Sequence, residues 1–154
     1  MEFTRDDHPF QRLFTLEEAN ATLPLVKAIV ADLSNLTRDV VERRQRCVAL
    51  SLGRDVNAKD PYTEELVEVE RELKEDTQRL SELVDELREL GVEPKNASIG
   101  LVDFPCELDG RIVLLCWQLG EPSVQFWHKI DGGYEGRQPV SGSFIGREKT
   151  NSLN

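Results

Sequence analysis

The longest regular pattern in the sequence is a series of apolar residues at alternating steps of three and four between residues 26 and 50. A second series with the same period spans residues 66 to 90. Such heptad spacing is typical of helices that pack along a narrow apolar seam. The turn and helix-start residues between the two series are Gly53, Asp55, Asn57, Asp60 and Pro61. The pattern therefore predicts a long, coiled-coil-like antiparallel hairpin of two helices, with Asp60 as the N-cap and Pro61 as the first residue of the second helix.

The predicted helices carry recognisable ends. Thr15 and Glu18 have the spacing of a capping box ahead of the first apolar series. Because Pro24 lacks a backbone donor and crowds the preceding turn, we expect a short capped helix that kinks or breaks near residues 20–23 before the first long helix begins. Gly91 is placed to end the second long helix in a left-handed conformation.

Beyond the second helix the apolar period changes to two, and β-branched and aromatic residues become common. We expect strands at Ile99–Phe104, Arg111–Gln118 and Val124–Ile130, with Asp109-Gly110 as a hairpin turn. The middle strand is apolar on both faces, so both faces of the sheet should be covered. The predicted fold class is α+β, in which the helical hairpin packs against a small antiparallel sheet.

A length of 154 residues fits one domain. We expect an N-terminal arm at residues 1–12, the domain at residues 13–140 and a mobile polar tail at residues 141–154. The cysteines Cys47, Cys106 and Cys116 are odd in number and form no Cys-x-x-Cys pair, and no apolar stretch reaches the length of a membrane span. These features predict reduced thiols and a cytoplasmic protein.

The charge of the chain excludes some partners. Nineteen Lys and Arg stand against 29 Asp and Glu, and residues 60–95 hold 13 acidic and 5 basic side chains. General binding to nucleic acid or to an anionic membrane is therefore not expected. The acidic helix is interpreted as a solvated face, with docking of a basic protein partner as the alternative. The basic stretch at residues 43–46 is interpreted as an exposed turn of helix.

The heptad seams favour a homodimer whose two hairpins form a four-helix bundle. Apolar residues beside the seam widen each stripe, so that each helix needs more than one neighbour; they are Val30, Val41, Val48, Val67 and Val84. Arg43 and Asp76 are the polar residues at seam positions and fall one layer apart. We expect an ion pair between them that fixes the helix register, with solvation of both side chains as the alternative.

Several short motifs resemble a known bacterial family, domain of unknown function 2203. They are Phe14-Thr15-Leu16-Glu17-Glu18-Ala19-Asn20, Leu23-Pro24, Gly100-Leu101-Val102-Asp103-Phe104-Pro105, Leu115-Cys116-Trp117, Gly120-Glu121, Phe126-Trp127-His128 and Gly136-Arg137. The resemblance covers about residues 13–140. It implies a small bacterial protein and supports the domain boundaries, but it implies no mechanism.

The densest set of polar and aromatic residues lies on or beside the predicted sheet. The expected small-ligand pocket consists of Asp103, Trp117, Glu121, Trp127, His128 and Arg137. In this pocket the indoles would stack on the ligand, Arg137 would bind a carboxylate or phosphate, and His128 would donate or carry a proton. The alternative is purely structural, with His128 donating to a backbone carbonyl and Arg137 paired with Glu121 or Asp131.

A divalent-metal site is the third interpretation of the same region, because imidazole, carboxylate and thiolate are ordinary ligands of zinc and related ions. The candidate ligands are His128, Glu121, Asp103 and Cys116. Strand register decides part of this set: Cys116 and His128 share a face if Leu114 lies opposite His128, and a shift by one residue separates them.

No motif in the sequence defines a reaction. The expected function is therefore a binding or protein-interaction module, homodimeric through its hairpin, with a pocket for a small anionic ligand at the sheet. The alternative is a metal-dependent enzyme that uses His128 with Asp103 and Glu121 as ligands.

Overall fold

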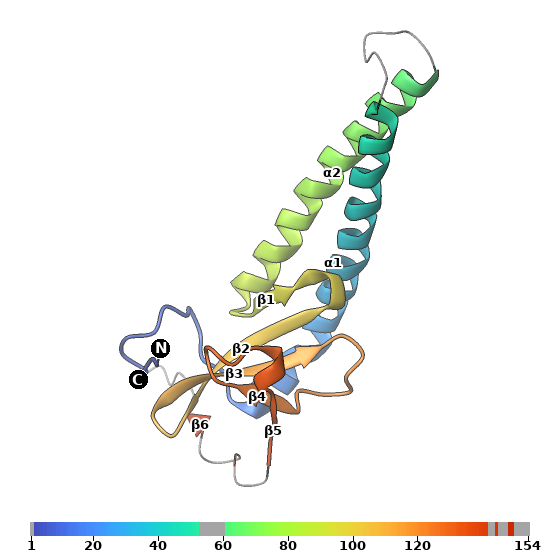
Figure 1. Ribbon diagram of the computed structural model, residues 1–154. Helices are drawn as coiled ribbons and strands as arrows, with labels where there is room; N and C mark the ends of the chain where they lie inside the picture. The colour runs from blue at the N-terminus through green and yellow to red at the C-terminus, as the bar shows by residue number, and fades with distance from the viewer. Residues whose placement is uncertain (1, 53–60, 142–143, 145–147, 150–154) are drawn as a thin grey trace.

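The fold is a long helical hairpin that stands on a small antiparallel sheet (Figure 1). The computed structural model describes residues 2–52, 61–141, 144 and 148–149. The two long helices are α1 (Leu16–Ser51) and α2 (Pro61–Glu89). The remaining elements are the strands β1 (Glu93–Asn96), β2 (Leu101–Leu108), β3 (Arg111–Gln118), β4 (Phe126–His128), β5 (Gln138–Pro139) and β6 (Glu148–Lys149), and the 3-10 helices η1 (Ala97–Ile99) and η2 (Tyr134–Gly136). The α+β class predicted from the sequence is confirmed.

Helix α1 begins at the predicted capping box, in which Thr15 Oγ1 accepts from Glu18 N and the Glu18 carboxylate accepts from Thr15 N. The expected break near residues 20–23 is wrong, because α1 runs through Pro24 as one helix of 36 residues. Pro24 lies on an exposed side of the helix. The Asn20 carbonyl that loses its partner there can accept from water, so the proline does not force the helix to end.

Helix α2 begins at Pro61 and ends in the left-handed turn expected at Gly91, which has a φ of 87°. Val92 N donates to Leu87 O and Gly91 N donates to Arg88 O, and this is the Schellman pattern. Leu50, Leu66 and Val69, with Cys47 against them, form a small separate core far from the sheet. The expected N-cap Asp60 and the turn before it lie outside the described residues.

The sheet has the order β1-β2-β3-β4-β5, all neighbours being antiparallel, and β6 also pairs with β2. β3 has the predicted bounds, and Asp109 and Gly110 turn with φ values of 51° and 78°, as in a two-residue hairpin. β2 begins and ends later than predicted and β4 is shorter, whereas β1, β5 and β6 were not predicted. They are strands of two to four residues, too short to show a period.

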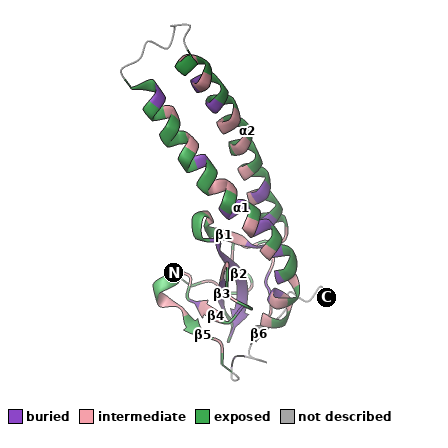
Figure 2. Cartoon of the chain, turned by 90° about the vertical axis from the view of Figure 1, so that its right-hand side faces the viewer, coloured by how far each residue is buried: buried purple, intermediate pink, exposed green. Residues whose placement is uncertain are grey.

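The two faces of the sheet have different covers. The core face, with Phe104, Leu115 and Trp117, packs against the N-terminal half of α1 and the C-terminal end of α2. The other face, called the outer face below, holds Asp103, Cys116 and His128 and lies under the N-terminal arm and residues 129–137. Figure 2 shows the buried residues gathered in the sheet and in the adjoining parts of the helices. The expectation that both faces are covered is confirmed: β3 is buried from Ile112 to Trp117.

Gly100 joins η1 to β2 where the chain passes close to α1. Its φ is 68°, and a Cβ at this position would lie 2.6 Å from Leu119 Cβ and 2.9 Å from Val30 Cγ1. Both the left-handed backbone and the lack of space require glycine here. The close contact fixes where β2 begins, and so where Asp103 lies along the strand.

The segment after residue 140 is described at only a few positions. Phe144 is buried in the main core, its ring centroid 6.1 Å from that of Trp127, and residues 148–149 pair with β2. The expected mobile tail falls mostly on residues outside the described part of the chain. Among the described residues, no helix is long and apolar enough to cross a membrane.

Candidate functional site

Three adjacent strands bring Asp103, Cys116 and His128 together on the outer face. Asp103 on β2 is the cross-strand partner of Cys116 on β3, and Leu114 on β3 is the partner of His128 on β4. This is the register that the sequence required for Cys116 and His128 to share a face. One potential ligand atom from each of the three side chains lies within 4.8 Å of the others.

The hydrogen bonds of His128 fix the role of each ring nitrogen. Nδ1 lies 2.6 Å from the Lys129 carbonyl oxygen, which can only accept, so Nδ1 carries a proton. Nε2 lies 3.1 Å from Asp103 Oδ1. In the neutral ring Nε2 holds a lone pair that points toward Asp103, and in the charged ring it donates to that carboxylate. Burial alone would lower the pKa of His128, but its hydrogen bonds to Asp103 and to the Lys129 carbonyl outweigh burial and raise it.

Asp103 is a buried carboxylate with an unused oxygen. The residue has no exposed surface, and its Oδ2 makes no hydrogen bond to any residue that the structure describes. A buried carboxylate oxygen without a hydrogen-bond partner is costly, and an ordered water molecule or a bound cation can satisfy it. Oδ2 therefore marks the position at which a ligand would complete the cluster.

Cys116 is the third member of the cluster and is also buried. Burial, the charge of Asp103 and a hydrogen bond to it raise the pKa of the Cys116 thiol to about 12. With a pKa this high and no cation present, Cys116 is a thiol at neutral pH. A cation between the two groups would favour the thiolate, which is the form that binds metals.

A small cavity of about 230 Å³ leads from the surface to this cluster. Asp103 and His128 line its inner part. The other lining residues are Lys95, Leu101, Ile130, Asp131, Gly133 and Tyr134. The cluster is thus buried under the outer face but open toward one side.

Glu121, expected among the metal ligands, is not in the cluster. It lies in the turn after β3, where Oε1 accepts from Gln118 N at 2.7 Å and both carboxylate oxygens accept from Arg137 Nη2, at 2.6 and 2.9 Å. Arg137 also donates to the Cys116 carbonyl, and its guanidinium lies 4.1 Å from the Phe126 ring centroid. Cys116 supplies the third potential ligand in place of Glu121.

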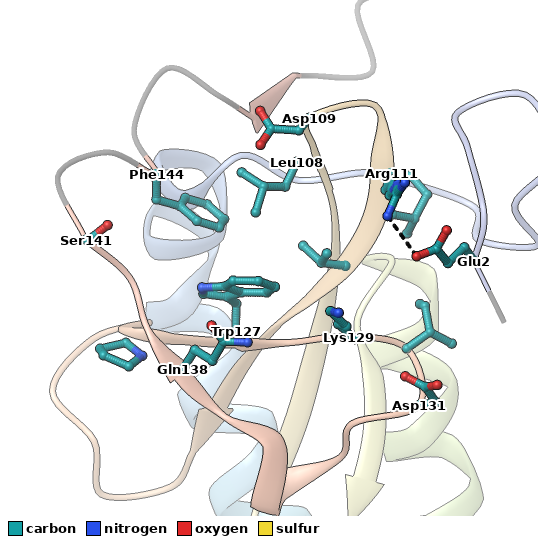
Figure 3. Close-up of a pocket in the computed structure, with 14 residues that line it drawn as sticks. Glu2, Leu108, Asp109, Arg111, Trp127, Lys129, Asp131, Gln138, Ser141 and Phe144 are labelled. Atoms are coloured by element: carbon teal, nitrogen blue, oxygen red, sulfur yellow. Dashed lines mark hydrogen bonds and ion pairs between the residues drawn. The ribbon is translucent and has the colours of Figure 1, made fainter.

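The six residues of the expected ligand pocket do not line one cavity. Trp117 is fully buried on the core face, where its Nε1 donates to the Glu121 carbonyl. Trp127 precedes His128 on β4 and therefore faces the opposite side of the sheet. It lines a separate cavity of about 830 Å³ between β3, β5 and Phe144, with Arg111 and Glu2 paired at its rim (Figure 3). The alternation of side chains along β3 and β4 separates the two indole rings from the polar cluster.

Two features of the site were not found from the sequence. Lys95 and Tyr134 line the small cavity, but β1 and η2, in which they lie, are too short to give a periodic signal. Asn20 belongs to the first family-like motif, and its side chain accepts from Val124 N at 2.8 Å and donates to Val124 O at 3.4 Å. Through this pair of bonds α1 holds the segment that leads into β4.

In the hairpin, the guanidinium of Arg43 contacts the Asp76 carboxylate within one chain. Arg43 Nε also lies 3.3 Å from Glu72 Oε2. About a third of the Arg43 side chain and a quarter of the Asp76 side chain are exposed. Arg43, Asp76 and Glu72 thus form a partly solvated network of three charges.

The fold and the cluster define an α+β protein in which a helical hairpin supports an antiparallel sheet with buried potential metal ligands. The chain belongs to the family described as uncharacterized conserved protein (DUF2203), whose model matches residues 12–140. No curated protein and no solved structure matches the chain. The matched range agrees with the one inferred from the short motifs.

Proposed function

We propose that the protein binds a divalent metal ion through Asp103, Cys116 and His128. The observation that carries the proposal is the buried, unpartnered Asp103 Oδ2 within a cluster that also offers an imidazole and a thiol. Carboxylate, thiolate and imidazole together are a usual donor set for zinc. No other group of residues in the described part of the chain brings three such donors this close.

The surroundings of His128 support the same proposal. Histidines that bind metals usually donate their second ring N–H to a carbonyl or carboxylate, which orients the ring and leaves the other nitrogen for the ion. Lys129 O accepts from Nδ1 in this way, so Nε2 is the available ligand atom. Three protein ligands with a fourth position open to a cavity are typical of catalytic zinc sites. This favours a metal-dependent enzyme over a purely structural metal site.

The direct test is the metal content of the full chain, purified without an affinity tag and measured by elemental mass spectrometry. We expect about one divalent ion per chain, and loss of a ligand in His128→Ala should weaken metal binding at least about 100-fold. Glu121→Gln is the matched control, because Glu121 was a candidate ligand that the structure places outside the cluster. Full binding by His128→Ala, or equal loss in both variants, would contradict the proposal.

A homodimer through the hairpin is a second proposal, supported by exposed apolar surface far from the sheet. Val41, Val48 and Val67 are 46%, 60% and 61% exposed. Each directly follows a seam residue, and in antiparallel helices such positions fall on the same flank of the hairpin. Val30 and Val84, expected to join this flank, pack against the main core instead. A second copy of the hairpin would cover the three exposed valines.

The charges of the hairpin support the expectation that nucleic acid is not a partner. Of the basic stretch at residues 43–46, Arg43 pairs with Asp76 and Glu72, and Arg46 pairs with Glu65. These pairs reduce the positive charge available to a phosphate backbone. The proposed thiolate ligand also fits the reducing cytoplasm expected from the cysteine pattern.

A further inference from the structure

We propose that the open position of the metal site receives a small oxyanion, carrying a carboxylate or phosphate group, and that Lys95 is its ion-pair partner. This inference rests on the proposed metal site, because the cavity that leads to the cluster is the space in which such an anion would lie. It adds to that site the chemical class of the ligand and the residue that selects it.

The placement of Lys95 is the first observation. β1 pairs with β2 through Glu93 opposite Asp103 and Pro94 opposite Val102, and the register then shifts so that Asn96 lies opposite Leu101. Lys95 is the extra residue of this β-bulge. Bulges redirect a side chain and are frequent beside active sites. Here the bulge is next to the strand position of Asp103, and Lys95 lines the cavity above the cluster.

The charge balance is the second observation. A divalent cation with an aspartate, a thiolate and a neutral imidazole has no net charge, so the proposed metal site does not neutralise the ammonium group of Lys95. Lys95 forms no ion pair with any residue that the structure describes, whereas Asp131 at the same rim already has an interaction partner. An anion would neutralise Lys95 and bind the metal at once.

The size of the cavity limits the ligand. A cavity of about 230 Å³ has room for inorganic phosphate or a short carboxylic acid. The half-exposed Tyr134 ring forms part of the rim, so a small apolar substituent on the ligand would contact it.

The test uses the full chain loaded with Co²⁺, whose visible absorbance responds to any new ligand on the metal. Inorganic phosphate and acetate are titrated separately, and the cobalt content is measured after desalting to show that the anion has not removed the ion. We expect at least one of the two anions to change the spectrum and saturate. Lys95→Gln should weaken its binding about tenfold, and Lys95→Arg should restore most of it.

Lys74→Gln is the matched control, because this exposed lysine of α2 undergoes the same change of charge but does not line the cavity. It should leave anion binding unchanged. Cobalt that binds with no spectral response to either anion would overturn the inference while the metal site stands, as would equal anion binding by Lys95→Gln and the unmodified protein. Failure of cobalt to bind would overturn the metal site itself.

Discussion

His128 Nε2 and Asp103 Oδ1 lie 3.1 Å apart, and the Lys129 carbonyl holds the opposite side of the same imidazole at 2.6 Å. In the metal-free protein this arrangement favours a charged histidine paired with a buried carboxylate. In the metal-bound protein the same geometry leaves Nε2 for the ion. The two states compete for the same atoms, so protons and metal should exclude each other at this site.

The stability of the metal-free protein should depend on the charge of His128. Its pKa is raised in the folded state, because its hydrogen bonds to Asp103 and Lys129 exceed the opposing effect of burial. The stabilisation is therefore fully present below the unfolded pKa of about 6.5 and is lost as pH rises through the higher folded value. Urea denaturation at several pH values from about 5 to about 8 measures the free energy of unfolding, which should fall across this range. An unfolded cysteine thiol ionises above this range, so the cysteines do not contribute to the fall.

His128→Gln should flatten this part of the pH profile, since glutamine does not titrate. His8→Gln is the control, because His8 lies in the N-terminal arm and its Nδ1 accepts from Phe10 N. If the pH profile of His128→Gln keeps its slope, or if that of His8→Gln becomes flatter, the pair of His128 with Asp103 is not the source of the pH dependence.

Gly100→Ala should destabilise the fold by about 2–5 kcal/mol. Alanine is strained in the left-handed backbone conformation of this position, and its Cβ would also clash with Leu119 and Val30. Gly110→Ala separates the two effects: Gly110 also has a positive φ, of 78°, but a Cβ there meets nothing within 4 Å. It should cost about 1–2 kcal/mol. Chemical denaturation of both variants gives the comparison, and equal losses would contradict the clash.

Much of the fold could be predicted because its signals are local. The capping box at Thr15, the Schellman end at Gly91 and the Asp109-Gly110 turn each depend on a few neighbouring residues. Pro24 was misinterpreted because the effect of a helical proline depends on whether solvent can reach the carbonyl it frees. That is a property of packing on the sheet, which the sequence of the helix does not contain.

The candidate site could be predicted only in part, because it depends on contacts between strands. Cys116 and His128 were expected on one face under one of two registers, and the observed pairing with Leu114 decides between them. Asp103 joins them through the β2–β3 register. Glu121 was assigned to the site by its nearness in sequence, but the turn directs it to Arg137. Lys95 was missed because β1, a strand of four residues, is too short to show a period.

Arg43 and Asp76 should show a coupling energy of about 0.5–1 kcal/mol in a double-mutant cycle with Arg43→Leu and Asp76→Leu, as is usual for partly exposed ion pairs. Glu72 also contacts Arg43, so Asp76→Leu alone should cost little. The Arg79–Glu82 pair is the control, because both of its side chains are about half exposed, and its coupling should be smaller. A coupling no larger than that of the control would mean that the seam pair does not fix the register.

The exposed valines of the hairpin predict a dimer. Light scattering at micromolar concentration should give about 35 kDa, twice the 17.5 kDa of the chain. Val48→Glu combined with Val67→Glu should yield a monomer, because two charges would be buried in the proposed interface. Glu64→Gln, a change at an exposed polar position of α2 that does not directly follow a seam residue, should leave the dimer intact. A monomer in the unmodified protein would contradict the proposal.

The near-ultraviolet spectrum of the Co²⁺-loaded chain tests the metal site most directly, because a thiolate bound to cobalt produces a charge-transfer band that oxygen and nitrogen ligands do not. Cys106 is the internal control: it is buried in β2 like Cys116 in β3, but it lies on the core face, away from Asp103 and His128. We predict that the band is present in the unmodified protein and in Cys106→Ser and absent in Cys116→Ser. A folded, cobalt-loaded protein without the band, or a band that survives Cys116→Ser, would contradict the assignment of Asp103, Cys116 and His128 as the metal site.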